Sequence, residues 1–226
     1  MIERLNKYLA FHLGVSRREA DLLIEQKRVR INGDVAPLGA RLKEGDTVSV
    51  NNEPVTKRAA FTYLAFHKPA GYVCSRKQQG DNETLYVLLP SKYHDLKPVG
   101  RLDKDSSGLI LLTNDGDFAY HMTHPKFYKV KNYEVSLNKA LEPLHQQMIS
   151  DFGIALEDGP SKLSLERRND ARTEWGVTMH EGRNRQIRRT FDTLGYDVTA
   201  LHRTSFGPYA LGNLPAGSFE IVDKRS

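Results

Sequence analysis

The sequence predicts an α+β protein in which a small helix–helix–strand module precedes a larger domain with an antiparallel sheet and helices on one side. Two helical patterns and several short strands fill residues 1–50. From Phe61 onward, strand and helix patterns alternate without the regular βαβ repeat of a parallel sheet. Residues 51–60 lack apolar periodicity and contain Pro54, which is typical of a linker. A domain boundary is therefore predicted there.

Helix and turn signals define the small module. Apolar residues at helical spacing predict its first helix, namely Ile2, Leu5, Leu9 and Leu13. Gly14 ends that segment. Ser16 and Glu19 then form a capping box, in which each side chain accepts a hydrogen bond from the backbone N–H of the other residue. The second helix is therefore predicted over residues 17–27.

Short strands complete this module. Residues 29–31 are predicted as a strand, and Asn32-Gly33 follows as a strong hairpin signal because both residues tolerate positive φ. Residues 46–50 supply another strand. Eleven basic and eight acidic side chains lie in residues 1–60, a net charge of +3 against +5 for the whole chain. More than half of the basic excess therefore lies in these first sixty residues.

Alternating patterns predict the elements of the larger domain. Candidate strands cover residues 62–67, 109–113, 131–137, 175–179, 197–202 and 219–222. Candidate helices cover residues 117–122, 141–151 and 184–194. Pro143 stands in the first turn of the second helix, and Gly195 closes the third.

Composition excludes several classes of protein. The chain has 226 residues, 39% of them hydrophobic, and a single cysteine, which is ordinary for a globular protein. Cys74 alone forms no internal disulfide and offers too few ligands for a structural zinc site. The apolar runs fall far short of the ~20 residues of a membrane span, and the N-terminus lacks the apolar stretch of a signal peptide. We expect a soluble, cytoplasmic protein that contacts no membrane.

Two segments of the larger domain combine turn residues with charge. The first, HKPAG at residues 67–71, taken alone is a turn in which proline fixes φ and glycine allows a left-handed position. The second, GRLDKDSSG at residues 100–108, holds two carboxylates and two cations within five residues and runs into an apolar strand. Catalytic groups are often carried by such loops. Asp103 or Asp105 is thus a candidate nucleophile or general base, the alternative being a solvated ion pair.

Two further segments are rich in cations. In KFYKVKNYEV, at residues 126–135, three lysines alternate with Phe127, Tyr128 and Tyr133. This pattern suits base stacking with phosphate contacts, or an edge strand whose lysines prevent aggregation. In EGRNRQIRR, at residues 181–189, four arginines surround the start of the predicted third helix, whose buried stripe includes Ile187. The lack of nearby acid favours an anion or phosphate site.

Taken together, these motifs resemble the RsuA-type family of bacterial ribosomal-RNA pseudouridine synthases. RLNKYLA, SRREA and VRINGDVA resemble an S4 RNA-binding module, in that order. HKPAG, GRLDKDSSGLILLTNDGD, KNYEV, EGRNRQIRR and LHRTSFGPYALGNLPAG resemble the catalytic domain. The resemblance covers essentially the whole chain. It implies a small α/β S4 domain at residues 1–55 and, at residues 61–226, a catalytic domain with a mixed, mainly antiparallel sheet flanked by helices.

The resemblance also implies roles for individual residues. Asp103 matches the catalytic aspartate, Tyr133 the tyrosine that stacks on the target base, and Arg188 the basic residue that pairs with the aspartate. Asp105 has no catalytic role in the family pattern. The implied substrate-binding residues are Arg101, Ile187, Arg183, Arg185, Arg189 and Lys68. The implied RNA-binding residues of the S4 module are Lys7, Arg17, Arg18, Arg28 and Arg30.

The sequence departs from the family pattern at two places. Ser106-Ser107 stands where a threonine is common, and a hydroxyl is retained there. Lys27 stands where the S4 pattern often has glycine, so the end of the second helix is expected to differ.

The implied reaction is the isomerisation of a uridine in ribosomal RNA, with 23S rRNA slightly favoured over 16S. The uridine is flipped out of the RNA, the N1–C1′ bond breaks, the uracil turns over, and C5 bonds to C1′. The reaction needs no metal or cofactor. The expected partner of a monomeric enzyme is ribosomal RNA or an assembling ribosomal subunit. Whether Asp103 attacks C1′, attacks the base or removes a ribose proton stays open.

Two alternatives come from other functional classes. A non-catalytic S4-type rRNA-binding or ribosome-assembly factor explains the basic patches but leaves the GRLD, tyrosine and RQIR motifs without a purpose. A haloacid-dehalogenase-type phosphatase would bind Mg²⁺ with Asp103 and Asp105. That class has a long apolar strand before the first aspartate, whereas here Pro98, Gly100 and Arg101 precede it.

Overall fold

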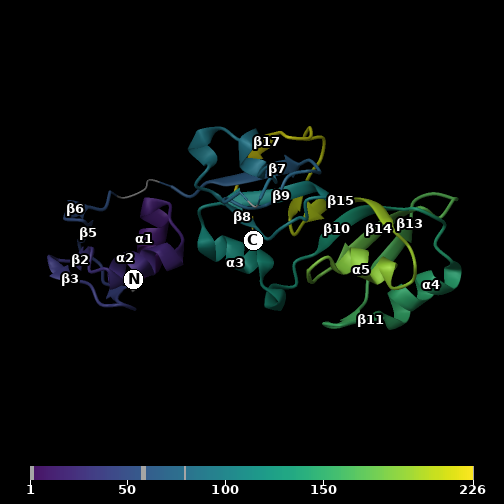
Figure 1. The fold of residues 1–226 in the computed structure, drawn as a ribbon, viewed down its shortest axis with the longest axis horizontal. Coiled ribbons are helices and arrows are strands. Elements are labelled where there is room, and N and C mark those ends of the chain that lie inside the picture. Colours follow the sequence, from purple (N-terminus) through teal and green to yellow (C-terminus); the bar gives the residue numbers. More distant parts are fainter. Residues whose placement is uncertain (1–2, 57–59, 79, 226) are drawn as a thin grey trace. The chain divides into compact units, whose positions relative to one another are not determined.

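The protein is described by a computed structural model that covers residues 3–56, 60–78 and 80–225. The chain forms two compact units, Met1–Thr62 and Tyr63–Ser226. The first unit comprises the elements β1 to β6, and the second comprises β7 to β17, as Figure 1 shows.

In the first unit, helices α1 (Leu5–Leu13) and α2 (Arg17–Glu25) share an apolar core with a sheet of order β3-β2-β5-β6. Buried Leu9, Ile24 and Val29 form part of this core. The strands are β1 (Glu3–Arg4), β2 (Val29–Ile31), β3 (Asp34–Val35), β4 (Arg41–Leu42), β5 (Val48–Val50) and β6 (Glu53–Pro54).

Local signals account for the ends of these elements. Gly14 ends α1 in the left-handed conformation, with φ of 71°. The capping box is confirmed, because the Ser16 backbone N–H donates to Glu19 at 2.7 Å and the Glu19 N–H donates to the Ser16 hydroxyl at 3.1 Å. Helix α2 ends two residues earlier than predicted. Lys27 then adopts φ of 57°, the position where glycine would be unstrained. Ile2 lies outside the described residues.

The linker prediction is wrong in its first part. Strand β6 pairs with β5, and Asn51 and Asn52 make the connecting turn with φ of 54° and 68°. Asparagine tolerates this left-handed region. A strand of two residues is too short to produce visible alternation, which is why residues 53–54 resembled a linker. The predicted hairpin at Asn32-Gly33 is confirmed and joins β2 to β3.

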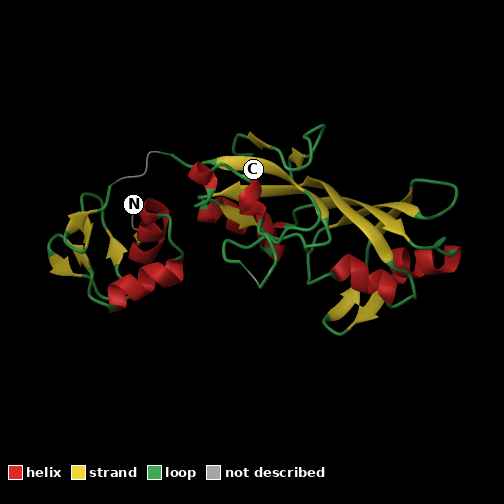
Figure 2. Ribbon diagram, turned by 45° about the horizontal axis from the view of Figure 1, so that its top comes forward, coloured by secondary structure: helices red, strands yellow, loops and turns green. Residues whose placement is uncertain are grey.

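The second unit is built on a mixed, mainly antiparallel sheet of order β13-β14-β10-β15-β9-β7-β17, so the predicted fold class is confirmed. Strands β15 and β9 are parallel, whereas the other pairs along this path are antiparallel. Figure 2 shows the long strands as one continuous twisted layer. Strands β8 and β16 pair with β9 and β15. The strands of this sheet are β7 (Tyr63–Lys68), β8 (Lys97–Val99), β9 (Ser107–Thr113), β10 (Lys131–Leu137), β13 (Ser164–Arg167), β14 (Glu174–Met179), β15 (Val198–Phe206), β16 (Tyr209–Ala210) and β17 (Phe219–Ile221).

Helices cover both faces of this sheet, so the prediction of helices on one side is wrong. Along β9, Leu109 packs in the core that contains α3, whereas its neighbour Ile110 packs in the core that contains α5. Successive residues of a strand point to opposite faces. The continuous apolar run of β9 is therefore buried on both faces.

The helical segments complete this unit. Predicted helices at 117–122 and 184–194 correspond to α3 and α5, and the predicted helix at 141–151 is split between α4 and a π-helical turn. The segments are η1 (Leu85–Leu88), η2 (Ser91–Tyr93), α3 (Gly116–Thr123), η3 (Pro125–Phe127), α4 (Pro143–Gln147), η4 (Met148–Phe152) and α5 (Gln186–Asp192). A separate hairpin consists of β11 (Ile154–Leu156) and β12 (Gly159–Ser161).

One of the two interpretations of residues 126–135 is wrong. Strand β10 pairs with β14 on one side and β15 on the other, so it is an interior strand. Its lysines therefore do not protect a sheet edge. Residues 126–130 lie before the strand, on η3 and the turn that follows it.

Candidate active site

Asp103 lies on the loop that joins β8 to β9. These strands form an antiparallel pair, and the loop crosses their end. The Asp103 side chain is 31% exposed, and the Ser106 backbone N–H donates to the Asp103 carbonyl at 3.1 Å. The loop is therefore folded back on itself with the carboxylate accessible from solvent.

Lys68 binds backbone carbonyls on the buried side of this loop. The side chain is fully buried, and its Nζ donates to the carbonyls of Ser106 at 2.6 Å, Pro69 at 3.0 Å and Asp103 at 3.1 Å. Burial lowers the pKa of Lys68. The prediction that Lys68 binds substrate is therefore wrong, because backbone carbonyls occupy the ammonium group. The sequence does not reveal this, because burial depends on the path of the loop.

The last residue of the HKPAG turn and the segment after it also contact the Asp103 loop. The Gly71 backbone N–H donates to the Lys104 carbonyl at 2.7 Å. The Leu102 N–H donates to Cys74 Sγ at 3.4 Å, and burial raises the pKa of this thiol. The cysteine thus has a structural position next to the Asp103 loop.

We expect Lys68→Met to lower the free energy of unfolding by about 3 kcal/mol, because the carbonyls it satisfies would be left buried without a donor. Thermal unfolding of the variant measures this loss. Lys104→Met is the matched control, since this lysine is exposed on the same loop. Equal melting temperatures for the two variants would contradict the role given to Lys68.

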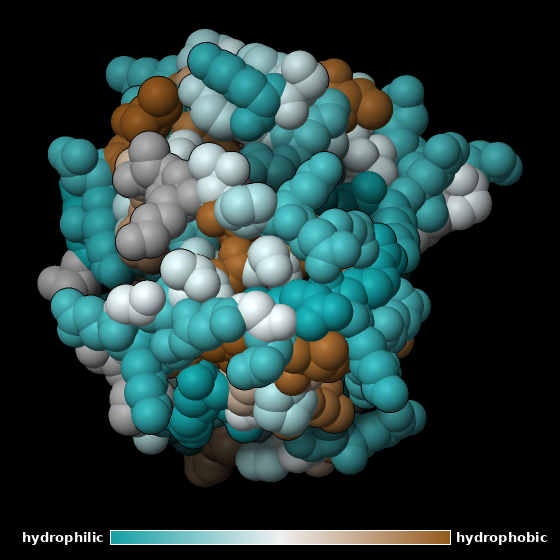
Figure 3. Space-filling model, turned by 90° about the vertical axis from the view of Figure 1, so that its left-hand side faces the viewer, coloured by the Kyte–Doolittle hydropathy of each residue, from teal (hydrophilic) through white to brown (hydrophobic). Residues whose placement is uncertain are grey.

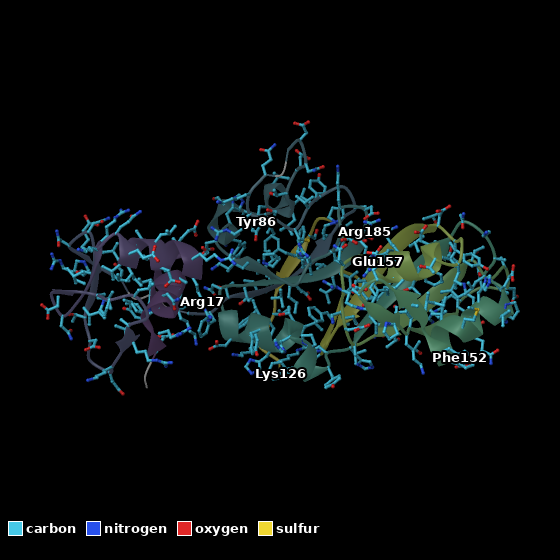
Figure 4. The ribbon with its side chains drawn as sticks, turned by 60° about the horizontal axis from the view of Figure 1, so that its bottom comes forward. Arg17, Tyr86, Lys126, Phe152, Glu157 and Arg185 are labelled. Carbon is cyan, nitrogen blue, oxygen red and sulfur yellow. The ribbon has the colours of Figure 1, made fainter. Side chains whose placement is uncertain are left out.

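Arg185 faces the Asp103 loop from the other side of the cavity. It precedes α5 in the left-handed conformation, with φ of 45°. Its guanidinium donates to both carboxylate oxygens of Asp105, at 3.1 and 3.2 Å, and lies 3.6 Å from Asp103 Oδ2. Figure 4 shows Arg185 where the two halves of the sheet meet. Arg185 therefore bridges the two carboxylates of the loop.

Arg188 pairs with Asp105 rather than with Asp103, so the predicted Arg188–Asp103 pairing is wrong. Its Nε lies 3.3 Å from Asp105 Oδ2, and its Nη1 donates to the Val198 carbonyl at 2.6 Å. The cause is the left-handed Arg185, which turns its own side chain over the loop before the helix begins. Arg188 lies almost one helical turn further along the chain.

Asp105 is held by both arginines. Burial alone would raise the pKa of Asp105, but the hydrogen bond from Arg185 and the charge of Arg188 hold it below its usual value. A lowered carboxyl pKa stabilises the fold above the unfolded-state value of about 4, and this contribution is lost only as the pH falls through the lower folded-state pKa. These ion pairs are therefore intact at neutral and mildly acidic pH.

Arg183 and Arg189 pair with Asp158 on the β11–β12 hairpin. Arg183 Nη1 lies 2.8 Å from Asp158 Oδ1, and Arg189 Nη2 lies 2.7 Å from Asp158 Oδ2. The interpretation of these arginines as unpaired is therefore wrong. The sequence does not predict this contact, because Asp158 is distant along the chain and reaches the arginines only through the folding of the hairpin.

A cavity of about 270 Å³ opens between the Asp103 loop and the start of α5. Tyr133 and Ile187, which are 8% and 4% exposed, contribute buried apolar surface to its lining. Arg188, Arg189 and Lys68 do not line it. The predicted residues that do line it are Arg101, Asp103, Tyr133, Arg183, Arg185 and Ile187.

Lys131 and Arg203 also line the cavity and were not predicted as site residues. Lys131 is the first residue of β10, two positions before Tyr133, and Arg203 pairs with Gly108 across the parallel strands. A Cβ on Gly108 would lie 2.3 Å from the Arg203 carbonyl oxygen, so only glycine permits this crossing. For Arg203 the available signal was the LHR string within the last family motif, whereas Lys131 is the first residue of KNYEV and one of the three lysines of residues 126–135.

An exposed aromatic patch adjoins the cavity. Thr123 and Pro125 line the cavity, and the side chains next to them form what we call the α3–η3 patch, which consists of Tyr120, His121, His124, Lys126, Phe127 and Tyr128. Lys126 Nζ lies 4.7 Å from the Phe127 ring centre and 5.1 Å from that of Tyr120. Figure 4 shows Lys126 at this end of α3. Tyr128 is 74% exposed and adopts φ of 46°.

The basic residues predicted to bind RNA in the first unit are accessible to solvent to different degrees. Arg17, Arg18 and Arg28 are exposed, whereas Lys7 and Arg30 are half-buried. Arg28 donates to Asn51, and Arg30 donates to the Gly33 carbonyl at 2.8 Å. Hydrophilic side chains cover most of the surface drawn in Figure 3.

Other kinds of site are not found in the part of the chain that the structure describes. No group of three or more histidine, cysteine, aspartate or glutamate side chains there is arranged to hold a metal ion. No described helix is long and apolar enough to cross a membrane.

Two family models match the chain. The model described as RNA pseudouridylate synthase matches residues 62–193, and the S4 domain model matches residues 3–48. The first match covers the cavity-lining loop that carries Asp103 and the start of α5.

Curated relatives align over almost the whole chain. A protein named ribosomal large subunit pseudouridine synthase B from Bacillus subtilis is 37% identical, over 96% of this chain and 90% of the relative. Ribosomal small subunit pseudouridine synthase A from Pasteurella multocida is also 37% identical, over 92% and 90%. The dual-specificity RNA pseudouridine synthase RluF from Salmonella typhi is 36% identical, over 97% and 78%.

A solved structure has the same fold. A crystal structure described as a pseudouridylate synthase is 30% identical in sequence, with a TM-score of 0.70. The similarity covers 98% of this chain and 96% of that one.

Proposed function

The chain belongs to the RNA pseudouridylate synthase family, and from that premise we propose that it converts a uridine of ribosomal RNA to pseudouridine with Asp103 as the catalytic residue. One observation carries the assignment to this site. Asp103 presents an accessible carboxylate to a cavity that is also lined by the Tyr133 side chain and faced by Arg185.

The cavity suits a single uracil removed from the RNA stack. A uridine in folded RNA must leave its stack, at a cost of a few kcal/mol. The Tyr133 ring replaces the lost stacking surface, and Ile187 packs against the base from below. Both side chains are held by the core, so the apolar walls are formed before the RNA binds.

The Arg185 guanidinium lies 3.6 Å from the Asp103 carboxylate, so a cation stands beside the proposed catalytic group. Only an ionised carboxylate can act as a nucleophile or a base. The reaction is an isomerisation: the N1–C1′ bond breaks, the C5–C1′ bond forms, and the proton on C5 moves to nitrogen with the help of solvent.

The identity of the target uridine is a separate question. The relatives include proteins named for the large subunit, for the small subunit and for dual specificity. The RLNKY, SRREAD and GRLDKDS strings resemble those of family members that act on large-subunit rRNA, so we propose a site in 23S rRNA. The S4-like unit, with exposed Arg17, Arg18 and Arg28, supplies sequence-independent phosphate contacts.

Site mapping tests this proposal. Ribosomal RNA from a deletion strain, complemented with wild type or with Asp103→Asn, is treated with carbodiimide and mapped by primer extension. We expect one stop in 23S rRNA that returns only with the wild-type protein. A stop in 16S rRNA would correct the choice of RNA, and identical maps from all strains would exclude ribosomal RNA as the substrate.

The α3–η3 patch is placed to hold nucleotides that flank the target. Base stacking on an aromatic ring contributes about 1–3 kcal/mol per base. We therefore expect the double variant Tyr120→Ala and Tyr128→Ala to weaken RNA binding roughly 10-fold or more and to leave the maximal rate near that of wild type. Equilibrium binding and single-turnover kinetics separate the two effects.

Phe152→Ala is the control for the patch, because this aromatic is 77% exposed but does not line the cavity. Its binding should equal that of wild type. If the tyrosine double variant also binds as wild type does, the patch plays no part in RNA recognition.

A further inference from the structure

Two cations in the wall of the cavity, Lys131 and Arg203, lie near one shared aromatic ring. Arg203 lies 5.0 Å from the Phe206 ring centre, measured from Cζ, and Lys131 lies 5.3 Å from it, measured from Nζ. Neither forms an ion pair with a carboxylate among residues 3–56, 60–78 and 80–225. Both line the cavity that holds Asp103.

Arg203 is the more unusual of the two. The residue is 2% exposed. Its Nε donates to the Leu109 carbonyl at 2.7 Å, but its buried Nη2 has no hydrogen-bond partner among the described residues. Buried arginine is rare unless it is paired, and a buried donor without an acceptor costs about 1–3 kcal/mol. The cavity wall therefore contains a buried guanidinium with one N–H group that lacks an acceptor.

Lys131 is partly satisfied by backbone oxygens. Its Nζ donates to the carbonyls of Glu181 at 3.2 Å and His180 at 3.3 Å, on the loop that leads from β14 to Arg183. Burial, together with the charge of Arg203, lowers the pKa of Lys131 to about 8. The two like charges therefore destabilise each other in the free protein, and a bound anion would relieve both.

We propose that Lys131 and Arg203 form an anion site in the wall of the cavity that binds an oxyanion of the target nucleotide. This inference rests on the proposed function. Two parts of that nucleotide supply the required chemistry. One is a backbone phosphate. The other is a uracil carbonyl oxygen, which gains negative charge when the N1–C1′ bond breaks and its electron pair stays on the base. Charge-assisted hydrogen bonds from Arg203 Nη2 suit either.

Lys131→Met and Arg203→Lys test the site, with RNA affinity measured over a range of salt concentrations and the single-turnover rate measured at saturating enzyme. If a phosphate binds, Lys131→Met weakens binding and lowers the magnitude of the salt slope by about 0.7–0.9. If the uracil oxygen binds, affinity and salt slope stay at wild-type values and the rate falls at least about 10-fold. Wild-type affinity, salt slope and rate in both variants would overturn the proposal.

Lys139→Met is the matched control, because Lys139 lies 4.9 Å from the Tyr196 ring but does not line the cavity. We expect it to behave as wild type. A further measurement leaves Lys131 and Arg203 themselves unchanged. The pKa of Lys131, followed by NMR of the methylated lysine in Asp103→Asn protein, should rise when RNA binds, and an unchanged value would contradict an anion beside it. A wild-type protein that forms no pseudouridine in the RNA would instead contradict the proposed function.

Discussion

Asp103→Asn should reduce pseudouridine formation by about 10⁴-fold or more, because a carboxamide cannot serve as a nucleophile or a base at this position. Asparagine has the same shape, and the hydrogen bond from Lys68 goes to the backbone carbonyl of residue 103. The loop should therefore keep its conformation, and RNA affinity should stay close to wild type. Tritium release from RNA that contains 5-tritiated uridine measures turnover, and equilibrium binding measures affinity.

Asp170→Asn is the control for this loss, because that carboxylate is exposed on the loop between β13 and β14 and does not line the cavity. It should turn over RNA at the wild-type rate. Turnover near wild type in Asp103→Asn would mean that another group performs the chemistry. Loss of RNA binding would mean that the carboxylate acts in recognition.

Asp105→Asn is expected to lower the maximal rate by about 10²-fold, because a displacement of the Arg185 guanidinium by roughly an ångström is enough to cause a loss of this size. Asp105 holds Arg185 through two hydrogen bonds, whereas Arg185 reaches Asp103 over a longer distance. Without the Asp105 charge, Arg185 loses the contacts that orient its guanidinium toward Asp103. We therefore assign Asp105 a positioning role, which the family pattern did not give it. The maximal rate should fall much more than the apparent RNA affinity.

A double-mutant cycle identifies the residue through which Asp105 acts. In an Arg185→Met background, Asp105→Asn should cause little further loss, because the group it positions is already absent. Fully additive losses would show that Asp105 acts independently of Arg185. Glu174→Gln is the control, because its carboxylate accepts a hydrogen bond from Ser136 away from the cavity lining. It should leave the cycle unchanged.

Local chemistry made much of the fold predictable. Gly14, the Ser16–Glu19 capping box and the Asn32-Gly33 turn each act within a few residues, so the sequence alone specifies their geometry. The interior strand β10 was predicted at its observed limits, because its buried positions alternate with polar ones. Strands of two or three residues carry little periodicity, so β6, β8 and β16 were missed, although β2, β5 and β17 of similar length were predicted.

The site was only partly predictable. The motifs led to Asp103, Tyr133 and Ile187, and the structure places all three around one cavity, while their roles remain predictions. The choice between Arg185 and Arg188 depended on a left-handed backbone conformation, which a run of arginines does not specify. The burial of Lys68 depended on a loop that is distant in the sequence. Contacts of this kind follow from the tertiary fold rather than from local sequence.

Strand β15 has a consequence for how the enzyme matures. It lies between β10 and β9, so among the described strands the group β13-β14-β10 and the group β9-β7-β17 are joined in the sheet through β15 alone. Its residues, Val198–Phe206, come after β9 and β10 along the chain, and pairing between distant strands is slow compared with local folding. A nascent chain that ends before β15 already contains Asp103, Tyr133 and Arg185. It lacks the strand that pairs with both β9 and β10 and so connects the two groups of strands. Catalytic competence should therefore appear in a single step, once β15 has paired with both groups of strands.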